Sequence, residues 1–421
     1  MSQTILDLGK TSRCGRQRSG ERAENTGGTV TEPLDIQRLI GLGGRARRLS
    51  SEEPMKPLHL LYACFNFRSC PLPCEGLVRS DLNWEGLIPI GEEERILPAL
   101  NARLQETGIS WLLPAEVASF FSAVEELNLE RNRAILAELA TVAALLNEVG
   151  IEPVLLKGAA YLVAGVYASP AARYLMDVDL LIPEPKMSIG IEALIQRGFE
   201  WDRRDRLGRF RHHHPPLRRA GSVPFELHHS LGMSSCKSLL PASEVLEQST
   251  RHEFGGARVR VPSPDHLMVH LIMHSQIQHP YNERIWPPLR AMYDLVLIQR
   301  RFESEIDWSS LEDRFRKAGQ SGVLAMHLLR VREVLGAETP FPIRLTGLTR
   351  LRWLRRRLLR ALPALRFLDP IYMYSTVLVR RLRLLRSALD VPGGWRHITR
   401  ELFAPSIYKR LITDVIEGRG R

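Results

Sequence analysis

The chain has 421 residues, 44% of them hydrophobic, and a formal net charge of +11 at pH 7. That amount of apolar material is enough for one large domain or two to three medium ones. Its most apolar runs are broken by charged residues or proline before ~20 residues, so we expect no transmembrane segment. Five unevenly spread cysteines support neither a disulfide framework nor a zinc site, and the cytoplasm is the expected compartment.

The N-terminal third divides into a polar extension and a helical segment. Residues 1–54 are Gly- and Arg-rich without helical or strand period, which predicts disorder or a start codon assigned too early, since Met55 follows. Residues 83–150 have helical spacing. The clearest helix is predicted within 115–149, where apolar residues recur at helical intervals (Ile135, Leu139, Val142, Leu146 and Val149) and Gly150 stands at the C-terminal cap.

The stretch 154–182, VLLKGAAYLVAGVYASPAARYLMDVDLLI, is the centre of the chain's predicted core at 151–262. It predicts a strand, a turn of small residues, a helix and a second strand over 174–182. Asp177 and Asp179 are two positions apart, so on a strand their carboxylates project from one face. Adjacent carboxylates repel each other unless a cation or a basic partner lies between them. The expected ligand is a hard divalent cation, Mg²⁺, for which Mn²⁺ can substitute.

A third carboxylate is predicted to join this pair. The strand 223–229 alternates, with Phe225 and Leu227 on one face and Glu226 and His228 on the other. Three carboxylates on neighbouring strands can hold the metal ions of phosphoryl or nucleotidyl transfer. Asp177, Asp179 and Glu226 are therefore the predicted catalytic and metal-binding residues. An isolated Asp-x-Asp also occurs as solvated acids at a strand edge, and from the residues alone that alternative stays open.

The turn after the first strand is a candidate phosphate site. Lys157, Gly158 and Ala159 open a predicted helix, whose free backbone N–H groups can receive a phosphate while Lys157 adds a point charge. Arg173 either contacts a phosphate or neutralises the paired acids. His228 is a candidate nucleotide contact because it shares the face of Glu226.

Other histidines have weaker predictions attached to them. His266, His270 and His274 recur every four residues on one predicted helix, where they bind a metal, pack locally or frame the cleft. The run 212–214 is predicted to be a strand end and loop, with contact to substrate as the alternative.

Taken together, these motifs resemble one family. The order LLKG, a helix ending in Tyr167, Arg173, MDVDLLI, FELHHSL and PSPDHLMVHLIMHS, followed by Asp294-Leu295, resembles the uncharacterised bacterial nucleotidyltransferases of the DNA polymerase beta-type superfamily. The resemblance covers residues 111–340. It implies an α+β fold with a small mixed β-sheet flanked by helices, two metal-binding carboxylates on one strand, and a third on a neighbour. By position these are Asp177, Asp179 and Glu226, with Gly158 in the phosphate turn.

The C-terminal half is predicted to be helical, with helices at 265–278, 286–301, 311–318 and 323–335 in a domain over 263–343. The tail, 344–421, contains 18 Lys and Arg against 5 Asp and Glu, a balance of +13 that leaves −2 for the rest. Its alternating Leu and Arg are compatible with an anionic membrane surface, with tRNA or another nucleic acid, or with a solvated helix face.

The function we predict is Mg²⁺-dependent transfer of a nucleoside monophosphate from a nucleoside triphosphate to an acceptor hydroxyl of unknown identity. Two alternative functions are compatible with the same residues. One is a toxin-like nucleotidyltransferase that modifies tRNA or protein, and the other is a catalytically degenerate module that binds nucleotide or protein.

Overall fold

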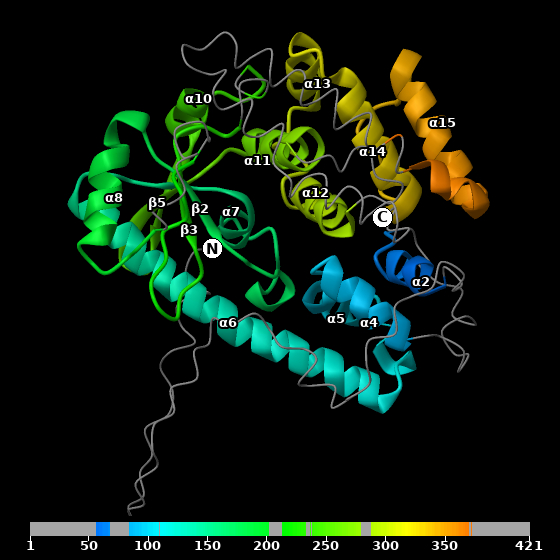
Figure 1. Ribbon diagram of the computed structural model, residues 1–421, viewed down its shortest axis with the longest axis horizontal. Helices are drawn as coiled ribbons and strands as arrows, with labels where there is room; N and C mark the ends of the chain where they lie inside the picture. Colours follow the sequence, from blue (N-terminus) through cyan, green and yellow to red (C-terminus); the bar gives the residue numbers. More distant parts are fainter. Residues whose placement is uncertain are drawn as a thin grey trace, which may run out of the picture.

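The computed structural model describes residues 56–67, 84–108, 110–201, 213–232, 236, 238–278, 288–369 and 372. Its architecture is α+β, as predicted. A mixed sheet and the helices around it make up one half, and a group of helices makes up the other (Figure 1). A single hydrophobic core connects the two halves, because buried residues from α2 to α14 belong to one cluster.

The sheet has five strands in the order β3-β2-β1-β5-β4. Their bounds are Val154–Leu155 for β1, Val178–Leu181 for β2, Phe225–His228 for β3, Thr250–Phe254 for β4 and Ala257–Val261 for β5. β1 is antiparallel to β2 and parallel to β5, while β2 and β3 run parallel. β4 and β5 form an antiparallel hairpin. The predicted small mixed sheet is therefore confirmed.

The longest helix, α6 (Ala115–Glu148), crosses the molecule and contacts both halves (Figure 1). Within the helix the apolar stripe is buried, as the spacing of Ile135, Leu139, Val142 and Leu146 predicts. Val149, predicted to continue it, is the C-cap residue and is 36% exposed. The helix ends where Gly150 adopts φ +73°, a left-handed conformation that glycine tolerates without steric cost. Helix α8 (Met187–Ile195) packs on α6, and the strands lie between α8 and α7 (Lys157–Val163) in Figure 1.

The other half is built almost wholly from helices, as predicted. Four of them fall close to the predicted ranges: α11 (Pro264–Ile272), α12 (Leu289–Arg301), α13 (Trp308–Lys317) and α14 (Ser321–Leu335). The predicted helix 265–278 is not uniform, because the α-helix ends at Ile272 and a π-helical segment, Met273–Gln278, continues it. The remaining helices are α2 (Lys56–Cys64), α4 (Trp84–Glu93), α5 (Leu97–Glu106), α10 (Ala242–Gln248) and α15 (Gly347–Ala361).

The prediction for the acidic strand was too long. Instead of covering 174–182, β2 starts at Val178, and a 3₁₀ turn, Pro170–Ala172, precedes it. The cause is a buried side chain of α6: the Asn132 amide donates to the carbonyls of Pro170 and Arg173, both at 2.6 Å. These bonds hold the backbone at Pro170 and Arg173 in a turn, and Asp177 lies just before the strand.

Several predictions fall outside the described residues. They include the extension 1–54, most of the tail beyond residue 369, and His212. Among the described helices, none combines the length and the apolar character needed to cross a bilayer.

Candidate active site

The site is centred on Asp179, which lies inside β2 and is 2% exposed. Its Oδ1 atom is 2.7 Å from Lys157 Nζ and 2.8 Å from His228 Nε2. Sheet pairing explains both neighbours. Leu156 donates its backbone N–H to the carbonyl of Asp179, which brings Lys157 alongside. In the parallel pair β2–β3, Asp179 is the register partner of Glu226, two residues before His228.

Glu226 and His228 lie on the same face of β3, as the alternation of that strand predicts. His228 Nε2 is 3.6 Å from Glu226 Oε2, and His213 Nδ1 is 3.9 Å from the same oxygen. His213 reaches the site because its backbone pairs with that of His228, and their rings are 5.0 Å apart. His213 was predicted only to end a strand, because its pairing with β3 has no local signal in the sequence.

The ionic character of this cluster follows from burial and mutual attraction. Burial alone would raise the pKa of Asp179, but Lys157 and His228 lower that pKa strongly, so the group is a carboxylate. Burial would lower the pKa of His228, yet its bonds to Asp179 and Glu226 raise that pKa above the usual value. Likewise the pKa of Glu226 is lowered against the effect of burial, chiefly by His228.

Asp177 lies at the margin of the cluster and is half-buried. Burial raises the pKa of its carboxyl, and the neighbouring charge of Asp179 raises it further, while Lys157 acts in the opposite direction. The two acids therefore share one electrostatic environment, as predicted. However, the metal-ligand atoms that lie within 4.8 Å of one another belong to Asp179, Glu226 and His228, so among the described residues the compact group contains His228 in place of Asp177.

The turn predicted to receive a phosphate through free backbone N–H groups is instead closely packed. Gly158 and Ala159 are both buried in α7. A Cβ on Gly158 would lie 2.6 Å from Leu175 Cδ2, which explains the glycine by close packing against the segment that leads into β2. Lys157 is the charged residue of this turn, and its side chain points to Asp179.

The structure corrects the prediction for Arg173. Its guanidinium donates to both carboxylate oxygens of Asp294 on α12, through Nε and Nη2 at 3.0 Å each, and to the carbonyl of Tyr174 at 2.7 Å. Tyr167 donates its hydroxyl to the same carboxylate. Arg173 thus neither neutralises the paired acids nor projects a free guanidinium toward a phosphate. It ties the approach to β2 to the helical half.

The predicted histidine row does not gather into a site among the described residues. His266 Nε2 is 3.1 Å from Glu244 Oε1 on α10, and Glu244 also binds Arg314 on α13. His270 and His274 have their rings 6.2 Å apart, on either side of the change from α-helix to π-helix. Local packing, one of the predicted roles, is what His266 has.

The donor atoms fit a divalent cation. Two carboxylates with a nearby third suit Mg²⁺ or Mn²⁺. His228 can join them only after it releases its proton, and its neutral imidazole then suits Mn²⁺ better, because Mg²⁺ prefers an all-oxygen shell. Oδ1 of Asp179 already accepts from two cationic groups, so a metal ion must share or displace them.

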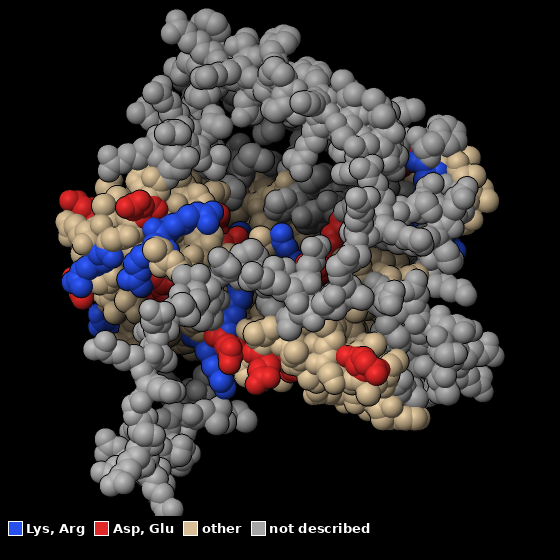
Figure 2. All heavy atoms as spheres, turned by 60° about the horizontal axis from the view of Figure 1, so that its bottom comes forward, with Lys and Arg blue, Asp and Glu red and all other residues tan. Residues whose placement is uncertain are grey.

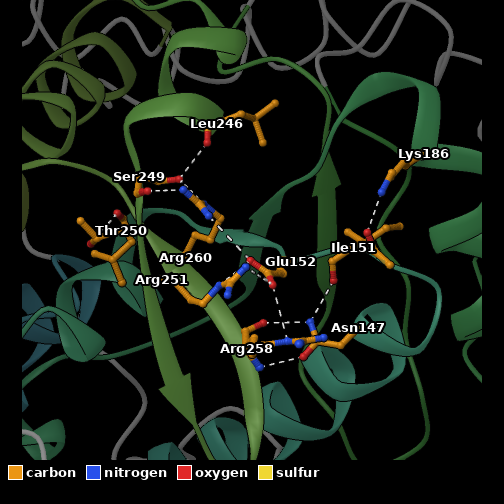
Figure 3. A network of polar contacts seen from close by, with 12 residues as sticks. Asn147, Ile151, Glu152, Lys186, Leu246, Ser249, Thr250, Arg251, Arg258 and Arg260 are labelled. Atoms are coloured by element: carbon orange, nitrogen blue, oxygen red, sulfur yellow. Dashed lines mark hydrogen bonds and ion pairs between the residues drawn. The ribbon is translucent and has the colours of Figure 1, made fainter.

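A second polar region lies at the opposite end of the strands, where β1 begins and β2 ends. It surrounds a cavity of about 430 Å³ lined in part by Asn147, Glu152 and Arg258. Glu152 attracts three arginines of the β4–β5 hairpin, with Arg251 Nη2 nearest at 2.8 Å (Figure 3). Asn147 bonds to the backbone of Ile151 and Arg258. These contacts fasten the hairpin to α6. Lys and Arg mix with Asp and Glu over the sheet half in Figure 2.

A small mixed sheet flanked by helices, with carboxylates on two neighbouring parallel strands, is consistent with a nucleotidyltransferase fold. Residues 80–336, more than half of the chain, match the family described as "Uncharacterised nucleotidyltransferase", and the chain belongs to that family. The family part of our prediction is thereby confirmed.

Two further comparisons add little. No curated protein matches the chain. A solved structure of an antigenic nucleotidyltransferase-like protein from Paracoccidioides brasiliensis is 16% identical over 49% of this chain and 97% of that chain. Its TM-score is 0.29, too low to support an argument.

Proposed function

We propose that this protein is a metal-dependent nucleotidyltransferase that transfers a nucleoside monophosphate from a nucleoside triphosphate to an acceptor hydroxyl. The observation that supports this most is the convergence of Asp179, Glu226 and His228 on neighbouring strands, in a chain of a nucleotidyltransferase family. A bound Mg²⁺ or Mn²⁺ would stabilise the charge that develops on the phosphates. Asp177, Asp179 and Glu226 would hold it.

In the proposed reaction the acceptor oxygen forms a bond to the alpha-phosphorus, and the bond to the beta-phosphate oxygen breaks. Pyrophosphate leaves with the electron pair of that bond. Glu226 is the proposed acceptor of the hydroxyl proton where it does not serve as a metal ligand, because His228 and His213 keep it ionised. Lys157, with the turn through Gly158 and Ala159, is proposed to contact the beta and gamma phosphates.

The decisive experiment measures nucleotide binding and pyrophosphate release for the four nucleoside triphosphates, with and without Mg²⁺. We expect metal-dependent binding in the wild type and its loss in Asp177→Asn/Asp179→Asn, with an unchanged circular dichroism spectrum. Turnover should fall by about 10²–10³-fold, the loss typical of removing electrostatic stabilisation of the transition state. Retained turnover in the double variant would refute the assignment, and binding without pyrophosphate release would favour a degenerate module.

The acceptor is the open part of this proposal. A tRNA acceptor would make the protein a toxin-like transferase, and growth arrest on expression, relieved by Asp177→Asn, is the result expected of that class. For the basic tail we propose an anionic membrane surface as the partner, because α15 exposes several leucines and contains arginines but no acid.

A further inference from the structure

The ammonium group of Lys157 lies beside Asp179, close to Asp177 and Glu226. Its Nζ is 2.7 Å from Asp179 Oδ1, and its side chain is only 21% exposed. Burial would lower the pKa of this ammonium, but Asp179, and then Asp177 and Glu226, raise that pKa above its ordinary value. One positive charge therefore interacts with all three carboxylates that we propose as metal ligands.

The backbone holds the lysine in an uncommon conformation. Lys157 has φ +48°, in the left-handed region that residues other than glycine, asparagine and aspartate rarely adopt. The chain turns here from β1 into α7, and the turn brings Nζ to a carboxylate on the neighbouring strand β2. Backbone strain of this kind concentrates at functional sites, where the surroundings fix a side chain in a required position.

A lysine and a divalent ion cannot both take the same carboxylate oxygen without repelling each other. Oδ1 of Asp179 also accepts from His228, so it has little capacity left for a third cation. Charge repulsion between the ammonium and an arriving ion is strong at such distances because the site is buried. In contrast, the phosphates of a nucleotide are anionic and can take up the ammonium once it leaves Asp179.

We propose that Lys157 acts as an exchangeable counter-ion, which occupies the cation position beside Asp179 until a metal ion displaces it toward the phosphates of the incoming nucleotide. This inference rests on the proposed metal-dependent function and adds a form of regulation to it. Metal and nucleotide then bind cooperatively, since each removes an obstacle to the other. A lysine that only contacts phosphate, or only supports the fold, does not oppose metal binding.

The test uses Mn²⁺ as the probe and the whole nucleotide-free protein. Electron paramagnetic resonance of free Mn²⁺ gives the dissociation constant for wild type, Lys157→Met and Lys157→Arg. We expect the Met variant to bind Mn²⁺ about tenfold more tightly, because one like charge is gone, and the Arg variant to resemble the wild type. In the presence of saturating Mn²⁺, the Met variant should bind nucleoside triphosphate about tenfold more weakly.

Lys186→Met is the matched control. Lys186 Nζ bonds to the carbonyl of Gly150 at the far end of the strands, so neither affinity should change (Figure 3). Lys157→Gln provides a second uncharged variant in case the Met variant does not fold.

The outcomes separate the two proposals. Equal or weaker Mn²⁺ binding by the folded uncharged variants would overturn the counter-ion role and leave the metal-dependent function standing. Absence of Mn²⁺ binding in wild type and variants, both without and with nucleoside triphosphate, would overturn the metal-dependent function, and the counter-ion role with it.

Discussion

His228 connects the two carboxylates of the site, and its protonation links their geometry to pH. Because its pKa is raised in the folded protein, its stabilising charge is fully present below the unfolded value of about 6.5 and disappears as the pH rises through the folded value. A buried, charge-assisted hydrogen bond of this kind contributes about 1.5–3 kcal/mol. The metal-free site is therefore most stable on the acidic side of neutrality.

We expect His228→Gln to lower the free energy of unfolding by about 2 kcal/mol at pH 6 and by clearly less at pH 9. Urea denaturation with a chelator present, at both pH values, measures the difference from wild type. His252→Gln is the control for loss of a histidine outside the site, because β4 and β3 are opposite edge strands of the sheet. A loss that stays constant or grows with pH would contradict the assignment of a raised pKa.

Between elements, the buried pair Arg173–Asp294 joins the approach to the acidic strand to α12. Arg173 is 8% exposed and Asp294 2%, so neither charge is compensated by solvent. Burial would lower the pKa of Arg173, but Asp294 raises it above the usual value, and the guanidinium stays charged. Removing one partner would leave the other as an uncompensated buried charge.

Asp294→Asn should accordingly lower the free energy of unfolding by about 3–5 kcal/mol, the range for breaking a buried ion pair. Urea denaturation measures this loss, and Glu303→Gln, an exposed change just after α12, gives the background. The double variant Arg173→Met/Asp294→Met should recover much of the loss, because both buried charges are gone. A single variant as stable as the Glu303 control would show that the pair contributes little.

The same elements show why part of the site could be predicted from sequence. Alternation along 223–229 put Glu226 and His228 on one face, and helical periodicity located α6, because both patterns reflect burial of neighbouring residues. Nothing local predicts that Arg173 meets Asp294, 121 positions later, or that Asn132 of α6 delays the start of β2. The position of Asp177 at the margin follows from those distant contacts.

In the molecule as a whole, α15 lies at the outer edge of the helical half (Figure 1). It buries one arginine and exposes most of its leucines, unlike an ordinary surface helix. Arg356 is 2% exposed, whereas five leucines are 45–63% exposed, and these are Leu348, Leu351, Leu354, Leu358 and, just beyond the helix, Leu362. The helix contains six arginines and no acid, so an anionic apolar surface complements it better than a nucleic acid does.

From this arrangement we expect the whole protein to bind vesicles containing anionic phospholipid and to bind neutral vesicles weakly. Leu351→Gln/Leu358→Gln should weaken binding to anionic vesicles about tenfold or more, since two apolar side chains no longer enter the interface. Arg350→Gln/Arg357→Gln should weaken it most at low salt, because screening already reduces the contribution of those charges at high salt. Vesicle co-sedimentation measures both effects, and Mn²⁺ affinity, which should stay unchanged, shows that the site is intact. If the leucine pair had no effect while an RNA competitor displaced the protein, the tail would serve a nucleic acid instead.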